Sequence, residues 1–222
     1  MTVEGLSKRI KKDDDWQIKF FPLDIDVVQD NGNDPIAVST VINTFLVERI
    51  LIDDSSAVEV LMWKAFQEMG LEESQLRPSG SIYGFANQSI RPKGIITLPV
   101  TIGQGEHTAT IMADFLVVDQ SSAYNAIIGR PLMKKTNMVS AVYCLTVKFP
   151  TPTGVGYIKA DQAMARQCHI QAIHLGKQAV CKPDSGTITS TPPISIPSPD
   201  WVASSLGSIR PVASDTQGSA LS

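Results

Sequence analysis

The sequence has few cysteines, no long apolar run and no excess of positive charge. Its three cysteines are Cys144, Cys168 and Cys181, and their number and spacing do not form a disulfide framework, so we expect reduced thiols. No two cysteines or histidines have the paired spacing of a zinc site, so we predict no bound metal. No stretch approaches the roughly 20 apolar residues that a membrane-spanning helix needs.

The charge balance is slightly acidic. Lys and Arg number 19 against 22 Asp and Glu, a net charge of -3, so the chain lacks the basic field that attracts nucleic acid. The N-terminal residues 1–12 are charged, and no apolar segment of a signal peptide follows them. We therefore expect an intracellular, cytoplasmic protein that binds neither nucleic acid nor membrane through this segment.

Length and composition indicate one domain with a loose segment at each end. Residues 1–33 mix runs of charge with a short apolar patch, which predicts a tail or linker. Residues 176–222 are rich in Ser, Thr and Pro, and they bury too little apolar surface to offset the entropy of ordering them. We predict a domain over residues 34–175 and a disordered C-terminal tail.

Within the domain the hydrophobic pattern is mainly β. Two β-branched runs, Ile36–Ile42 and Phe45–Ile52, predict a hairpin that ends at Asp53. Apolar residues from Val58 to Met69 recur at helical spacing, with Glu59 on the opposite, solvent-facing side, and Gly70 follows as a stop, which predicts a helix. Further strands are predicted at 81–85, 94–102, 107–118, 124–128, 144–149 and 155–158, and further helices after residue 129 and over 161–174.

The most informative stretch is the turn after the second of these strands. An apolar strand delivers Asp53 into the small or polar residues Asp54, Ser55, Ser56 and Ala57, and such a strand can hold a carboxylate where water is scarce, which suits acid–base chemistry. Residues 117–123 repeat the pattern of 51–57 and predict a pseudo-symmetric core. This repeat raises Asp119 as a second carboxylate in one chain, but the intervening segment is too short for two full lobes, which favours one aspartate per chain. No G-x-S-x-G elbow or cysteine motif indicates another hydrolase.

Several segments, in this order and spacing, resemble the retropepsin-like protease region of plant gypsy-type LTR-retrotransposon Gag-Pol polyproteins. The most specific of them is Phe115–Asp119 followed by Ser122–Pro131. The resemblance extends over roughly residues 34–175. The remaining matching segments are 34–38, 49–63, 94–100, 148–151, 154–156, 161–162 and 165–168.

This resemblance implies a mainly β, closed barrel-like acid-protease fold that works as a homodimer on a peptide or polyprotein substrate, with no metal or organic cofactor. Asp53 takes the catalytic position, one from each chain, and the four residues after it form the active-site loop. The resemblance assigns the flap to Phe85, Ala86, Asn87, Gln88 and Ser89, and the support of the active site to Ile127, Ile128 and Gly129.

Two loop residues depart from the family pattern of aspartate, a small or polar residue, and glycine. Ser55 stands in place of the glycine, which accepts positive φ and close backbone approach, so we expect strain there. Asp54 adds negative charge near the two-fold axis, which would weaken a dimer. Three alternatives stay open: an aspartic endopeptidase, an inactive protease-fold module that dimerises or binds peptides, and a cellular ubiquitin-shuttle type, for which no ubiquitin-like segment is visible.

Overall fold

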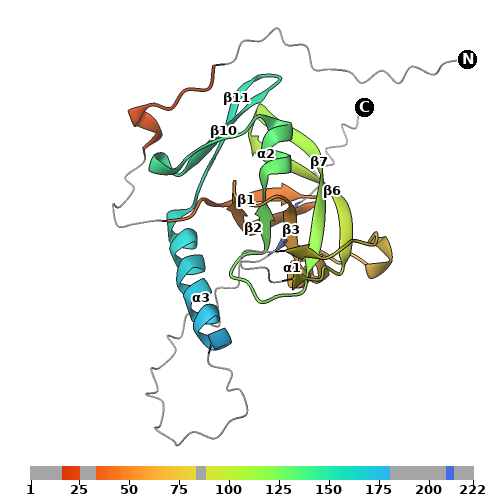
Figure 1. Ribbon diagram of the computed structural model, residues 1–222. Helices are drawn as coiled ribbons and strands as arrows, with labels where there is room; N and C mark the ends of the chain where they lie inside the picture. The colour runs from red at the N-terminus through yellow and green to blue at the C-terminus, as the bar shows by residue number, and fades with distance from the viewer. Residues whose placement is uncertain (1–16, 26–33, 84–88, 181–208, 213–222) are drawn as a thin grey trace, which may run out of the picture.

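Six strands close into a barrel-like ring at the centre of the computed structural model, which describes residues 17–25, 34–83, 89–180 and 209–212 (Figure 1). Neighbouring strands around the ring are hydrogen-bonded, and the first also pairs with the last, which closes it. This confirms the predicted mainly β, barrel-like fold. In ring order the strands are β1 (Ala37–Ile42), β6 (Gly94–Gln104), β7 (His107–Val118), β3 (Glu59–Met62), β8 (Ala126–Ile128) and β2 (Phe45–Ile52).

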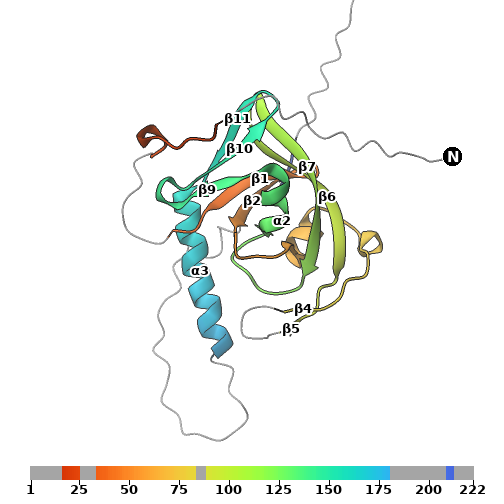
Figure 2. The same cartoon turned by 45° about the horizontal axis from the view of Figure 1, so that its top comes forward.

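Two smaller sheets and three helices surround this ring. A three-stranded sheet formed by residues 139–159 lies at one end of the barrel (Figure 2). The longest helix, over residues 162–180, extends away from the side of the barrel (Figure 2). No helix in the described ranges has the length and hydropathy to cross a membrane. The added elements are β4 (Ile82–Tyr83), β5 (Ser89–Ile90), β9 (Val139–Ala141), β10 (Thr146–Thr151), β11 (Gly154–Lys159), α1 (Trp63–Glu68), α2 (Arg130–Thr136) and α3 (Gln162–Val180).

The predicted helix over residues 58–69 is wrong in its first half. Glu59–Met62 form β3, parallel to β7 on one side and antiparallel to β8 on the other, and α1 begins only at Trp63. All four residues of β3 are buried, so the strand lacks the polar–apolar alternation of a half-exposed strand. The apolar residues of β3 happen to continue the helical spacing of α1, and the pattern therefore predicted one helix over both segments.

The barrel interior is filled by side chains that alternate inward along each strand. This main core joins residues from every strand of the ring to residues of α1, α2 and the β10–β11 hairpin. Its largest fully buried side chains include Phe66, Phe115, Phe149, Ile50 and Leu61.

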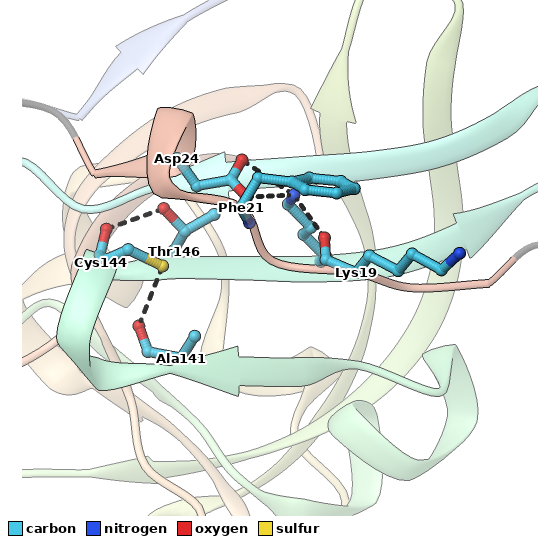
Figure 3. A network of polar contacts seen from close by, with 7 residues as sticks. Lys19, Phe21, Asp24, Ala141, Cys144 and Thr146 are labelled. Carbon is cyan, nitrogen blue, oxygen red and sulfur yellow. Dashed lines mark hydrogen bonds and ion pairs between the residues drawn. The ribbon is translucent and has the colours of Figure 1, made fainter.

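The described part of the N-terminal segment, residues 17–25, is held by a buried lysine of β10 (Figure 3). Lys148 Nζ donates to the carbonyl oxygen of Lys19 and to both carboxylate oxygens of Asp24, each at 2.8 Å. The hydrogen bond from Lys148 holds the pKa of Asp24 below its usual value, and a bond from the Phe21 amide acts in the same direction. This part of the predicted tail is thus ordered against the β9–β10–β11 sheet.

The C-terminal segment contributes one short strand to the ring. Arg210–Pro211 form β12, which pairs antiparallel with the start of β2, and Arg210 binds Glu48 at 2.6 Å. This differs from the disorder predicted for residues 176–222, as does α3, which continues to Val180. Residues 181–208 and 213–222 lie outside the described residues, so the disorder predicted for them stays a prediction.

Candidate active site

Asp53 lies at the end of β2, where β8 runs parallel to it. Ile52 is paired with Ile128, and the amide of Asp53 donates to the carbonyl oxygen of Ile128 at 2.9 Å. The structure thereby brings the predicted catalytic residue and the predicted supporting segment together. Asp53 is half-buried in the single chain, and Asp54, Ser55 and Ala57 are exposed.

The loop folds around the carboxylate of Asp53. The amide and the hydroxyl of Ser55 both donate to Asp53 Oδ1, at 2.9 and 2.6 Å. The amide of Ser56 donates to the carbonyl oxygen of Asp53 at 3.2 Å, and the Ser56 hydroxyl donates to the carbonyl oxygen of Val58. Bonds of this kind between an aspartate and the backbone two residues later fix a tight turn.

The strain expected at Ser55 is absent. Positive φ occurs at four non-glycine residues of the described part of the chain, and Ser55 is not among them. The turn therefore accommodates a side chain at the glycine position of the family pattern, and the serine hydroxyl instead occupies one oxygen of the aspartate. The residues with positive φ are Asn43, Arg49, Asn137 and Leu145.

Gly129 and Arg130 hold the loop from the start of α2. A Cβ on Gly129 would lie 2.4 Å from the carbonyl oxygen of Val58 and 2.9 Å from that of Ser56, so only glycine lets the backbones approach this closely. The guanidinium of Arg130 donates to the carbonyl oxygens of Asp54 and Ser55, at 3.1 and 2.6 Å, and its amide donates to that of Ser56. Three successive carbonyl groups of the loop are thus fixed by one residue.

A buried carboxylate, predicted to lie on a helix surface, lies behind this support. Glu59 of β3 is 4% exposed, and its Oε1 accepts the amide of Leu132 in the first turn of α2 at 2.6 Å. Burial raises the pKa of Glu59, and the bond from Leu132 opposes that shift. An acid directly after the loop in an otherwise apolar run was the available signal, but the helical pattern assigned it to a solvent face.

The two isoleucines of β8 point to opposite faces of the sheet. Ile128 packs in the main core, whereas Ile127 packs against a second, smaller apolar cluster. Around the buried Val60, Met62, Leu116 and Val118, this cluster gathers the half-buried Val58, Ile90, Ile95 and Ile127. It therefore joins the end of the Asp53 loop to the β4–β5 hairpin through apolar side chains.

The predicted flap is described only in part. Ser89 lies in β5, which pairs antiparallel with β4 as a hairpin requires, while Phe85, Ala86, Asn87 and Gln88 lie outside the described residues. Asp119 is exposed at the end of β7, 3.7 Å from Lys93 Nζ. Among the described residues no group of three or more His, Cys, Asp or Glu could hold a metal ion.

This geometry defines a class of protein, namely a mainly β barrel with an aspartate turn that is supported by a parallel strand. Comparable shapes occur in the retroviral protease-like domain of Ddi1 from Leishmania major (16% identity, TM-score 0.45, covering 59% of this chain and 93% of that one). A retropepsin-like aspartic protease from Rickettsia conorii is also similar (12% identity, TM-score 0.36, covering 55% and 79%). No protein-family profile matches the chain, and no curated protein matches its sequence. Identity at this level transfers no activity to this chain.

Proposed function

We propose that the chain is a retropepsin-like aspartic endopeptidase domain whose active site forms between two copies. The observation that carries this proposal is the position of Asp53, held at a strand end by the Ile128 carbonyl and by a loop that Gly129 and Arg130 brace. A carboxylate at a fixed, half-exposed turn can face its counterpart across a two-fold axis.

The chemistry follows from pairing two such carboxylates. Like charges about 3 Å apart cannot both ionise, so the pair shares one proton. The ionised member takes a proton from a water molecule as that water attacks the peptide carbonyl carbon, and the protonated member polarises the carbonyl oxygen. This reaction needs no metal or organic cofactor.

A peptide substrate fits the apolar surface beside the loop. The half-buried side chains of Val58, Ile95 and Ile127 adjoin the aspartate turn on one side and Ile90 of the β4–β5 hairpin on the other. Apolar side chains of an extended peptide would gain free energy by covering them. We therefore assign this cluster to substrate side chains and the hairpin to the flap.

The finer origin of the domain rests on the sequence resemblance. The segments that resemble plant gypsy-type Gag-Pol polyproteins support a retrotransposon source and a polyprotein substrate.

A second candidate is an inactive protease-fold module that dimerises or binds peptides. Ser55 favours it, because its hydroxyl donates to Asp53 Oδ1 in addition to its amide, and a glycine at this position could not make that second bond. The negative charge of the exposed Asp54 also opposes close approach of two loops.

A cleavage assay with a protein substrate at roughly pH 4 to 6, the range in which carboxylate dyads work, separates the two candidates. We expect cleavage by the natural chain and by Asp119→Asn, and none by Asp53→Asn. If Ser55→Gly cleaves the substrate and the natural chain does not, the natural sequence is the inactive module. Loss of cleavage in Asp119→Asn would instead indicate a dyad within one chain, and sedimentation of the natural chain as a strict monomer would exclude the dimeric site.

A further inference from the structure

Arg49 is a buried charge in a strained backbone conformation. Its side chain is 5% exposed, and its φ is 58°, in the left-handed region that side chains other than glycine seldom adopt. The residue lies at an irregularity of β2, where the register against β1 shifts between Val38 and Thr40. Strained positions of this kind persist where the surrounding structure fixes them, and they concentrate at functional sites.

The charge of Arg49 has no acidic partner in the described part of the chain. Its Nη1 donates to Oε1 of Gln171 in α3 at 3.0 Å, and this is a neutral acceptor. The ion pairs of the described residues use other cations. A buried guanidinium presents five donors and is costly to bury without a counter-ion, so Arg49 retains donors that an anion could accept.

A cavity of about 330 Å³ has Arg49 in its lining. Arg49 and its partner Gln171 line it together with the loop that follows β7, which supplies hydroxyl groups from Ser121, Ser122 and Tyr124. Burial raises the pKa of Tyr124 to about 12, so its phenol keeps its proton and can donate. Trp63 adds an aromatic wall, and no residue of the Asp53–Ala57 turn lines the cavity.

The loop that lines the cavity is fixed to the strand that carries Arg49. Asn125 donates from its side chain to the carbonyl oxygen of Glu48 and from its amide to that of Arg49, each at 2.9 Å. The thiol of Cys168 in α3 contacts the carbonyl oxygen of Ala123 at 3.5 Å. Three elements, β2, the loop and α3, therefore hold the guanidinium and the hydroxyl groups in one place.

We propose that this cavity, the Arg49 cavity, binds a ligand carboxylate that pairs with the Arg49 guanidinium. The planar fork of arginine matches a carboxylate with two parallel hydrogen bonds, and the neighbouring hydroxyl groups can donate to the same anion. The charges at the rim favour a singly charged group over a phosphate dianion, because Lys64 pairs with Glu68 at 3.8 Å and the lining also carries the carboxylate of Asp119. The site shares no residue with the aspartate turn.

Nuclear magnetic resonance titration of the full chain, at constant ionic strength, tests the proposal. The signals to follow are Nε of Arg49 and the indole Nε1 of Trp63. The probes are acetate, inorganic phosphate, and the peptide acetyl-Ala-Ala as its free acid and as its C-terminal amide. We expect saturable shifts with acetate and the peptide acid, and none with the amide. If the peptide acid binds more tightly than acetate, the carboxylate comes from a peptide terminus. If the two bind equally, the ligand is a small free acid.

Arg49→Gly is the informative variant, because glycine suits the positive φ while it removes the charge. Its carboxylate affinity should fall at least about 10-fold, the scale of a lost charged hydrogen bond. Arg77→Gln removes an exposed guanidinium outside the cavity and should bind as the natural chain does. Equal binding of peptide acid and amide by the unaltered chain overturns the proposal even if the variant fails to fold. Unchanged affinity in Arg49→Gly, or tighter binding of phosphate than of acetate, also overturns it.

Discussion

Ser55 decides what the aspartate turn can do, because its amide and hydroxyl both bind Asp53 Oδ1. The amide bond belongs to the turn itself, whereas the hydroxyl bond exists only because a serine stands at this position. Since Ser55 has no positive φ, its substitution to glycine would remove the hydroxyl without relieving a strained backbone. The effect of Ser55→Gly on cleavage therefore reports on the hydroxyl.

Glu59 should make the protein less stable as pH rises. Its pKa is raised in the folded state by burial, so above roughly pH 4 the unfolded chain loses this proton first. Between the unfolded and folded pKa values the folded state binds more protons, and the free energy of unfolding falls with pH. The loss amounts to about 1.4 kcal/mol for each unit by which the pKa is raised.

Glu59→Gln keeps a side-chain oxygen that can accept the hydrogen bond from the Leu132 amide, but the new side chain does not titrate. Urea denaturation at a series of pH values gives the free energy of unfolding of both proteins. The fall with pH should be absent in the variant, so its stability relative to the natural chain should increase as pH rises. Glu73→Gln, at an exposed position, controls for the change in net charge. A natural chain whose stability rises with pH as much as that of Glu59→Gln would contradict the burial of a raised-pKa acid.

At the scale of elements, the active-site support is a strand–glycine–helix unit. β8 lies between β2 and β3, parallel to the first and antiparallel to the second, and α2 begins directly after it with Gly129 as its N-cap. The sequence predicted the strand, the break at glycine and the helix, because each has a local signal. It did not predict that β3 is the neighbour on the far side, since a short, fully buried strand has no alternation.

Gly129→Ala should loosen this unit and lower stability. The added Cβ would lie 2.4 Å from a backbone oxygen of Val58, which a flexible side chain cannot relieve, so we expect a loss of about 1–3 kcal/mol. Gly80→Ala is the matched control, because a Cβ there meets nothing within 4 Å and its φ is not in the left-handed region. Thermal unfolding of both variants gives the comparison, and equal midpoints would show that the contact at Gly129 does not constrain the loop.

At the scale of the whole molecule, the described part of the chain carries one aspartate turn of the required kind, at Asp53. The repeat of its pattern at residues 117–123 contains Asp119, but this carboxylate is exposed and lies beside Lys93. Composition predicted loose ends, yet Asp24 and Arg210 each anchor a part of those ends through a charge partner. Such long-range pairs leave no local signal in a sequence.

Mixing the natural chain with Asp53→Asn at constant total concentration, and measuring peptide cleavage after subunit exchange, tests the two-chain site most directly. In a symmetric dimer with one aspartate from each copy, only pairs of natural chains are active. Cleavage should therefore fall as the square of the natural fraction, to about one quarter at an equal mixture. A fall in simple proportion, to about one half, or the absence of cleavage by the natural chain, would contradict the proposed function.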